Sequence, residues 1–92
     1  MTGDAAVPAF ATGVKFRFDA VRDAWIVLAP ERLFLPDEQA VEILKLVDGI
    51  SNLGRIIDEL TARYDAPRAL IAGDVETMLS DLADKGVVRW RT

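Results

Sequence analysis

Alternating apolar and polar residues mark the first part of the chain as β-structure. Val14, Phe16 and Phe18 alternate with polar residues, which is the two-residue period of a half-buried strand. Residues 19–23 have the composition of a hairpin loop. The run 24–29 is nearly all apolar, which is typical of a strand covered on both faces. We therefore expect a hairpin whose second strand is central in its sheet.

A short third strand is predicted at residues 32–35, after a turn at Pro30-Glu31. Pro36 should end this strand, because proline has no N–H to donate to a ladder. Three strands in this order make a small antiparallel meander, and the third strand lies at one edge of it.

After the third strand the apolar period becomes helical. Asp37 is a suitable N-cap for a first helix, which Asp48-Gly49 ends. Ser51 or Asn52 caps a second helix, in which apolar residues recur at steps of three and four until residues 65–67 break it. The period thus predicts two successive amphipathic helices.

The third and longest helix is predicted at residues 68–85, with Gly86 as its end and a short final strand at 87–91. The second and third helices have the spacing of a helix-turn-helix, and the sheet would be its wing. The predicted fold is therefore α+β and winged helix-turn-helix-like, with a three-stranded antiparallel β-meander followed by three α-helices.

The N-terminal residues show no clear period. Pro8 interrupts their apolar side chains, and Asp4 is the only charge before residue 13, so the basic start of a signal peptide is missing. We expect residues 1–12 to be a flexible tail or linker and residues 13–92 to form one folded domain. Because no run approaches the ~20 apolar residues of a membrane helix, we predict a cytoplasmic protein with no membrane partner.

Cysteine and histidine are both absent from the 92 residues. Thiolate zinc sites, iron–sulfur ligation, disulfides and Ser–His or Cys–His relays are therefore excluded within the chain. The carboxylates fall at predicted caps or on solvated faces, with neither a nucleophile nor a glycine-rich phosphate loop beside them. We expect no catalytic residues, no metal, no cofactor and no enzyme activity.

The charge pattern argues against a nucleic-acid partner. The formal net charge is −4, and the solvent face of the predicted third helix carries Asp74, Glu76, Asp81 and Asp84. A recognition helix passes between two rows of phosphates, which these carboxylates repel. We expect the helix-turn-helix shape to serve another purpose, and an acidic winged-helix transcription factor is the alternative.

The predicted edge strand is unusually apolar, with Leu33, Phe34 and Leu35 in succession. An edge strand exposes unpaired N–H and C=O groups that another strand can pair with. The third helix would lie alongside, with Met78 and Leu79 at the margins of its apolar stripe. Strand and helix together would form a groove for an extended peptide. Self-association through the same edge, giving a homodimer, is an equally open alternative.

An ordered series of residues resembles the PqqD family of pyrroloquinoline quinone biosynthesis, over about residues 13–90. The series consists of Trp25, Leu28, Ala29-Pro30-Glu31-Arg32, Ala40, Ile43-Leu44, Asp48-Gly49, Ile56, Leu60, Tyr64-Asp65, Asp74-Val75, Leu79 and Leu82. The resemblance implies that residues 13–92 are a PqqD-like peptide-binding domain, the stand-alone form of a RiPP recognition element. Such a peptide chaperone binds the precursor peptide PqqA and presents it to the radical SAM enzyme PqqE.

The resemblance also implies where the peptide binds. In related recognition elements the leader peptide adds as a strand to the third β-strand and packs on the third helix. Met78 and Leu79 are ranked above Val75 and Leu82, which lie at the centre of the stripe. The predicted peptide-binding residues are Arg32, Leu33, Phe34, Leu35, Val75, Met78, Leu79 and Leu82.

Overall fold

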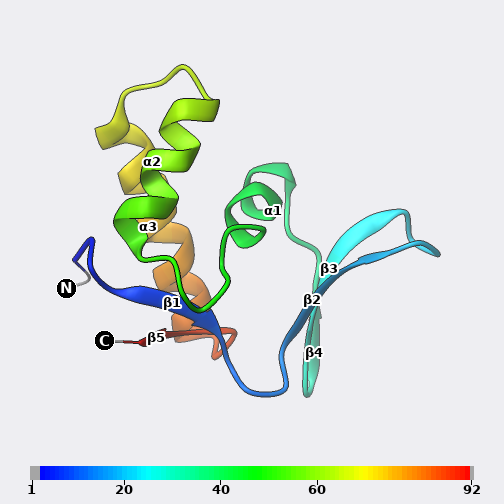
Figure 1. Ribbon diagram of the computed structural model, residues 1–92. Helices are drawn as coiled ribbons and strands as arrows, with labels where there is room; N and C mark the ends of the chain where they lie inside the picture. The colour runs from blue at the N-terminus through cyan, green and yellow to red at the C-terminus, as the bar shows by residue number, and fades with distance from the viewer. Residues whose placement is uncertain (1–2, 92) are drawn as a thin grey trace.

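The computed structural model describes residues 3–91, so residues 1, 2 and 92 of the predicted segments lie outside it. The fold is α+β, and a three-stranded antiparallel meander followed by three helices confirms the predicted class (Figure 1). The structure also contains a two-stranded sheet that the sequence pattern does not predict. In chain order the elements are β1 (Val7–Phe10), β2 (Lys15–Asp19), β3 (Ala24–Ala29), β4 (Arg32–Phe34), α1 (Glu38–Leu44), α2 (Leu53–Arg63), α3 (Arg68–Asp84) and β5 (Val88–Arg91).

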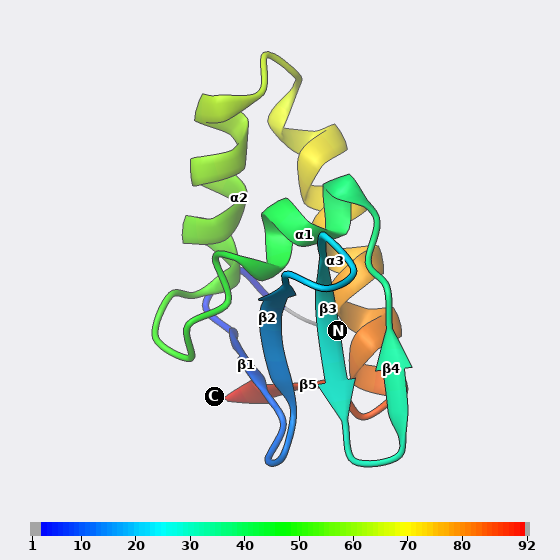
Figure 2. The same cartoon turned by 90° about the vertical axis from the view of Figure 1, so that its right-hand side faces the viewer.

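The meander has the strand order β2-β3-β4, so β3 is central and β4 is an edge strand. Figure 2 shows this sheet in front of α3. Aromatic side chains extend along it, since the Phe16 and Trp25 rings stack with centroids 4.8 Å apart and Phe18 meets Trp25 edge-on at 5.8 Å. Val27 of β3 is buried in the main core. Ile26, the adjacent residue in the strand and therefore on the opposite face, is also buried, with an exposed fraction of 1%. The central strand thus packs on both faces, which accounts for its continuous apolar run.

Side-chain caps begin the first two helices, as the sequence predicts. Asp37 accepts a hydrogen bond from the Ala40 N–H at 2.8 Å, at the start of α1. Of the two residues predicted to cap α2, Asn52 does so, accepting from the Arg55 N–H at 2.8 Å. Gly86 follows α3 with φ 77°, a left-handed conformation that glycine adopts without strain.

The prediction of a flexible tail or linker over residues 1–12 is wrong for β1, which pairs antiparallel with β5. The Ala11 N–H donates to the Val87 C=O at 2.9 Å. Because hydrogen bonding alternates along an antiparallel ladder, this bond places Pro8 in a pair with Trp90 that needs no N–H directed at β5. Proline is therefore compatible with this strand, and its ring is fully buried.

The segment before β1 also satisfies the start of α2. The first N–H groups of a helix have no partner within the helix. Here the Leu53 N–H donates to the Ala6 C=O at 2.8 Å, and the Gly54 N–H donates to the Asp4 C=O at 2.9 Å. The N-terminal segment is thus part of the folded unit at both of its ends.

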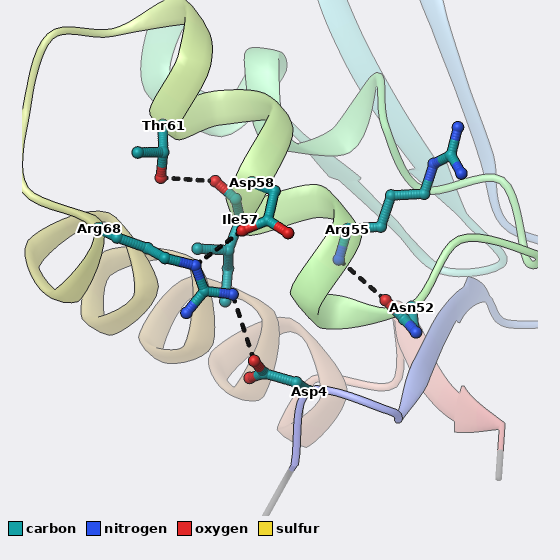
Figure 3. Close-up of polar contacts among 7 residues, drawn as sticks. All are labelled: Asp4, Asn52, Arg55, Ile57, Asp58, Thr61 and Arg68. Atoms are coloured by element: carbon teal, nitrogen blue, oxygen red, sulfur yellow. Dashed lines mark hydrogen bonds and ion pairs between the residues drawn. The ribbon is translucent and has the colours of Figure 1, made fainter.

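Arg68 adds a side-chain link between this segment, α2 and α3 (Figure 3). Its Nε lies 2.7 Å from Asp58 Oδ1, and its Nη2 lies 3.2 Å from Asp4 Oδ2. A hydrogen bond to Asp58, which has the larger effect, and a hydrogen bond to Asp4 raise the pKa of Arg68. The side chains are exposed, so the main anchors of the segment are the backbone bonds and the burial of Pro8.

One continuous core joins β3, the three helices, the turn before β5 and the start of β5. Its buried members are Val27, Ile43, Leu44, Val47, Leu53, Ile56, Ile57, Leu60, Val75, Leu79, Val87 and Val88. Within residues 3–91, no helix is long and apolar enough to cross a membrane.

Candidate functional site: the free edge of β4

The site is built on the outer edge of β4, whose only strand partner in the described sheet is β3. Two residues, Pro30 and Glu31, connect Ala29 to Arg32, and these flanking residues form a pair in the ladder. Ala29 and Arg32 must therefore be a hydrogen-bonded pair. In the other type of antiparallel pair the hydrogen bond would come from the N–H of residue 30, and Pro30 has none. Bonding alternates from there, so the N–H and C=O of Leu33 point away from β3.

The predicted third strand, 32–35, is one residue too long, since β4 ends at Phe34. Leu35 would lie opposite Ile26 in the next pair of the register. By the same alternation, a ladder that included the Leu35–Ile26 pair would need a hydrogen bond from the N–H of residue 36. Residue 36 is a proline, which has no N–H. Leu35 therefore lies beyond the ladder, with its side chain 64% exposed.

Apolar side chains lie on both faces of this edge. Phe34 is half-buried and packs against the main core, and the Arg32 guanidinium lies 5.8 Å from the centre of its ring. Leu33 is on the opposite face, because side chains alternate along a strand, and it is 40% exposed. Both faces of an added strand would therefore find apolar contacts.

The four predicted residues of α3 divide into two pairs. Val75 and Leu79 are buried in the core, with exposed fractions of 1% and 0%, so neither reaches the surface. Met78 and Leu82 are half-buried and pack against the same core as Phe34. The expectation that Leu79 lies at the margin of the apolar stripe is wrong, because Leu79 lies on the inner side of the helix. Of the four predicted residues of α3, Met78 and Leu82 are therefore the two that are partly accessible.

The groups whose pKa is shifted, Asp19, Asp48 and Arg68, lie away from β4. A hydrogen bond from Arg22 lowers the pKa of Asp19 in the β2–β3 turn. Backbone hydrogen bonds from Ser51 and Ile50 lower the pKa of Asp48, between α1 and α2. In the described part of the chain no group of three or more acidic side chains is arranged to hold a metal ion. The chemistry of the β4 edge is therefore that of hydrogen bonding and apolar contact.

Comparison with known proteins assigns this arrangement to a family. Residues 24–88 match the family described as coenzyme PQQ synthesis protein D (PqqD). This match spans β3, β4, all three helices and the start of β5. The chain belongs to the PqqD family. The resemblance seen in the sequence is thereby confirmed.

Relatives and solved structures of PqqD agree along nearly the whole chain. The PqqA binding protein of Rhodopseudomonas palustris (strain BisB5) is 52% identical over 83 residues, 90% of this chain and 81% of that protein. The PqqA binding protein of Gluconobacter oxydans is 42% identical over 88 residues, 96% of this chain and 92% of that protein. Each match thus covers most of the relative as well as most of this chain.

The solution structure of the PqqD truncation of Methylobacterium extorquens PqqCD, described as a functional, stand-alone RiPP recognition element, has a TM-score of 0.79. It is 43% identical, with 97% of this chain and 95% of that chain covered. The crystal structure of PqqD from Xanthomonas campestris has a TM-score of 0.57 and 33% identity, covering 92% and 94% of the two chains. The PqqD fold is thus shared by proteins that differ at more than half of their positions.

Proposed function

We propose that this chain binds the precursor peptide PqqA as an added strand on β4 and presents it to the radical SAM enzyme PqqE. The observation that carries the proposal is the outward-pointing N–H and C=O of Leu33 on an apolar, unpaired edge. Members of the same family that are 52% and 42% identical are PqqA binding proteins. The protein from M. extorquens is described as a RiPP recognition element.

The peptide backbone and its side chains contribute differently to this proposed complex. Hydrogen bonds to Leu33 fix the register of the peptide, and each contributes only about 0.5–1.5 kcal/mol net. Side chains on one face of the peptide pack against Phe34, Met78 and Leu82, and those on the other face meet Leu33 and Leu35. Burial of apolar surface stabilises by roughly 25 cal/mol per Å², so these contacts provide most of the affinity.

The chain itself does no chemistry in this proposal. Iron–sulfur clusters are held by cysteine thiolates, and the chain has no cysteine, so the radical chemistry belongs to PqqE. The role of the small domain is to hold PqqA in a defined, extended form. That role needs a rigid scaffold with one open edge, and no catalytic group.

Titration of the ¹⁵N-labelled protein with PqqA peptide tests strand addition directly. We expect the amide signals of Leu33, Phe34 and Leu35 to move, together with those of Met78 and Leu82, while β1 and β5 change little. The Leu33 amide should also become protected from exchange, because its N–H gains a partner. Binding of PqqA that leaves all β4 amides unchanged would falsify this mode of recognition.

Self-association is the second use to which the same free edge lends itself. A dimer formed by pairing β4 with its own copy would bury the same backbone groups as the peptide. Light scattering over a concentration series measures it, and PqqA should dissociate any such dimer. For the transcription-factor alternative, we expect no DNA binding in a gel shift at low salt, because α3 exposes Asp74, Asp81 and Asp84.

A further inference from the structure

A hollow of about 550 Å³ lies between α1, the end of α2 and the first turns of α3. Its lining includes the apolar side chains of Ile43, Leu60 and Ile71. Tyr64 and Leu70 also line it, with exposed fractions of 45% and 59%. The hollow therefore offers apolar surface that the described part of the chain leaves uncovered.

The charged residues that line this hollow are all acidic. They are Glu38, Glu42 and Asp74. Glu42 already accepts from Arg63 at 2.9 Å, but Glu38 and Asp74 have no ion-pair partner within residues 3–91. Asp74 has only a long contact of 3.5 Å with the amide of Gln39. Two carboxylates beside an apolar floor complement a ligand that is both apolar and positively charged.

The hollow continues the β4 site along the same helix. Asp74 lies four residues before Met78, which is one turn, or about 6 Å, along α3. On the other side Glu38 follows Phe34 by four residues, and the Gln39 amide at the start of α1 lies 3.5 Å from the Asp74 carboxylate of α3. A peptide that leaves the Phe34 end of β4 therefore has the hollow directly ahead of it.

We propose that this hollow is a second subsite for the bound precursor peptide. It takes a large apolar side chain of the peptide, and a neighbouring lysine or arginine of the same peptide faces Glu38 and Asp74. This inference rests on the proposed function, because the occupant is the peptide that pairs with β4. The subsite would set which end of the peptide lies at α1, a choice that main-chain pairing with one short strand leaves weakly defined.

A charge-matched pair of variants tests the subsite. Glu38→Gln with Asp74→Asn removes the two unpaired carboxylates, and Asp23→Asn with Asp84→Asn removes two exposed carboxylates elsewhere. By isothermal titration at low salt, we expect the first variant to bind PqqA roughly tenfold more weakly and the second to stay within about twofold of the native chain. The difference should shrink at high salt. Equal affinities for the two variants overturn the subsite.

Two further measurements separate the subsite from the site on β4. Ala66→Trp places a large side chain in the hollow without altering β4, and it should also weaken PqqA binding by about tenfold. Thermal melts confirm that each variant is folded. Amide shifts at Leu33 with unchanged affinity in both Glu38→Gln/Asp74→Asn and Ala66→Trp would refute the subsite but leave the proposed function intact. Failure of the native chain to bind PqqA overturns both.

Finally, each lysine and arginine of PqqA can be replaced by methionine. One replacement should weaken binding to the native chain but have no effect on Glu38→Gln/Asp74→Asn, because the variant has already lost that pair. A scan in which every replacement acts equally on the two proteins counts against the inference.

Discussion

The strands β1 and β4 are alike in sequence but differ in how their outer edges are treated. Both are short and mostly apolar, and each has a proline within it or two residues from its end. In β1 the proline stands within the strand, where Pro8 occupies a pair that needs no N–H toward β5. By the same alternation the outward positions of β1 are Pro8 and Phe10, so one of the two lacks a donor. In β4 the corresponding outward position is Leu33, which keeps its N–H. The proline in β1 thus removes one of the outward donors that an added strand would need, whereas β4 keeps its outward donor.

The surroundings of the two strands increase this difference. The segment before β1 is held against α2 by the carbonyls of Asp4 and Ala6, and Pro8 is buried. β4 is held by β3 and by the packing of Phe34 on the core. One short strand thus stabilises the fold, and the other is available to a ligand. Variants in and around the two strands test this division.

The largest effect is expected from deletion of residues 1–10. The deletion removes β1 with its buried Pro8, the Phe10 ring that stacks on Phe16 at 5.9 Å, and two backbone acceptors for α2. We expect a loss of about 3–5 kcal/mol in the free energy of unfolding, measured by urea denaturation. Asp4→Ala is the control, since it removes only an exposed ion pair and should cost less than about 1 kcal/mol. A truncated chain as stable as the full one contradicts the assignment.

Two neighbouring residues of α3 should separate stability from binding. Leu79→Ala leaves a cavity in the core and should destabilise by about 3 kcal/mol or more. Met78→Ala removes a half-buried side chain and should cost roughly half as much, while weakening PqqA binding severalfold. Denaturation and titration of both variants measure the two effects. If Leu79→Ala remains folded and loses more affinity than Met78→Ala, the peptide contacts the inner side of the helix.

The same two regions show which elements can be predicted from the sequence and which cannot. The period of two from Val14 and the caps at Asp37 and Asn52 were sufficient for the meander and the helices. The pattern does not predict β1 because Pro8 interrupts the apolar run, although proline is permitted at an edge pair without a hydrogen bond. The run of apolar residues around Pro8 was the available signal. Its partner, β5, lies about 80 residues away, and local pattern carries no information on such pairing.

For the site, the sequence located the edge strand but not the depth of each side chain. A helical stripe identifies apolar residues that share a face, and it does not tell the centre of the face from its margin when the neighbouring elements are unknown. The pattern therefore does not show that Leu79 is buried more deeply than Leu82. The hollow beside α1 was missed because its walls come from three elements, and their meeting at the Gln39–Asp74 contact depends on the tertiary fold.

Replacement of Leu33 by proline gives β4 the feature that Pro8 gives β1, which is a proline at a position whose N–H would point away from the sheet. Leu33 stands in a pair that does not use its N–H, as Pro8 does in β1, so the ladder should survive at a cost of about 1 kcal/mol. The variant has no outward donor, and its ring obstructs an added strand. We expect PqqA affinity to fall at least tenfold, equal to about 1.4 kcal/mol.

Leu33→Ala is the matched control for this experiment, because it shortens the side chain and keeps the N–H. Its affinity for PqqA should lie between those of the native chain and Leu33→Pro. Circular dichroism shows whether both variants keep their sheet. Native affinity in folded Leu33→Pro would mean that PqqA binds through side chains alone.

The smallest effect concerns pH and belongs to the region of β1 and β5. Asp48 accepts hydrogen bonds from the N–H groups of Ser51 and Ile50 at 2.7 and 2.9 Å, and these bonds lower its pKa. The same turn touches β5, because the Gly49 C=O accepts from Arg91 at 2.8 Å. The turn therefore supports the region that β1 completes.

A group whose pKa is lowered by folding stabilises the fold while it is ionised, and it stops doing so as the pH falls through the lowered value. At pH 7 the native chain should therefore melt slightly above Asp48→Asn, and the gap should close below about pH 4, near the pKa of an unperturbed aspartate. Thermal melts from pH 7 to pH 3 measure it. PqqA affinity at pH 7 should be the same for both proteins, because Asp48 is remote from β4 along the chain and in the fold. A weaker affinity in Asp48→Asn would show that the two regions are coupled. The strand that stabilises the fold, β1, and the strand that is available to a ligand, β4, would then belong to one cooperative unit.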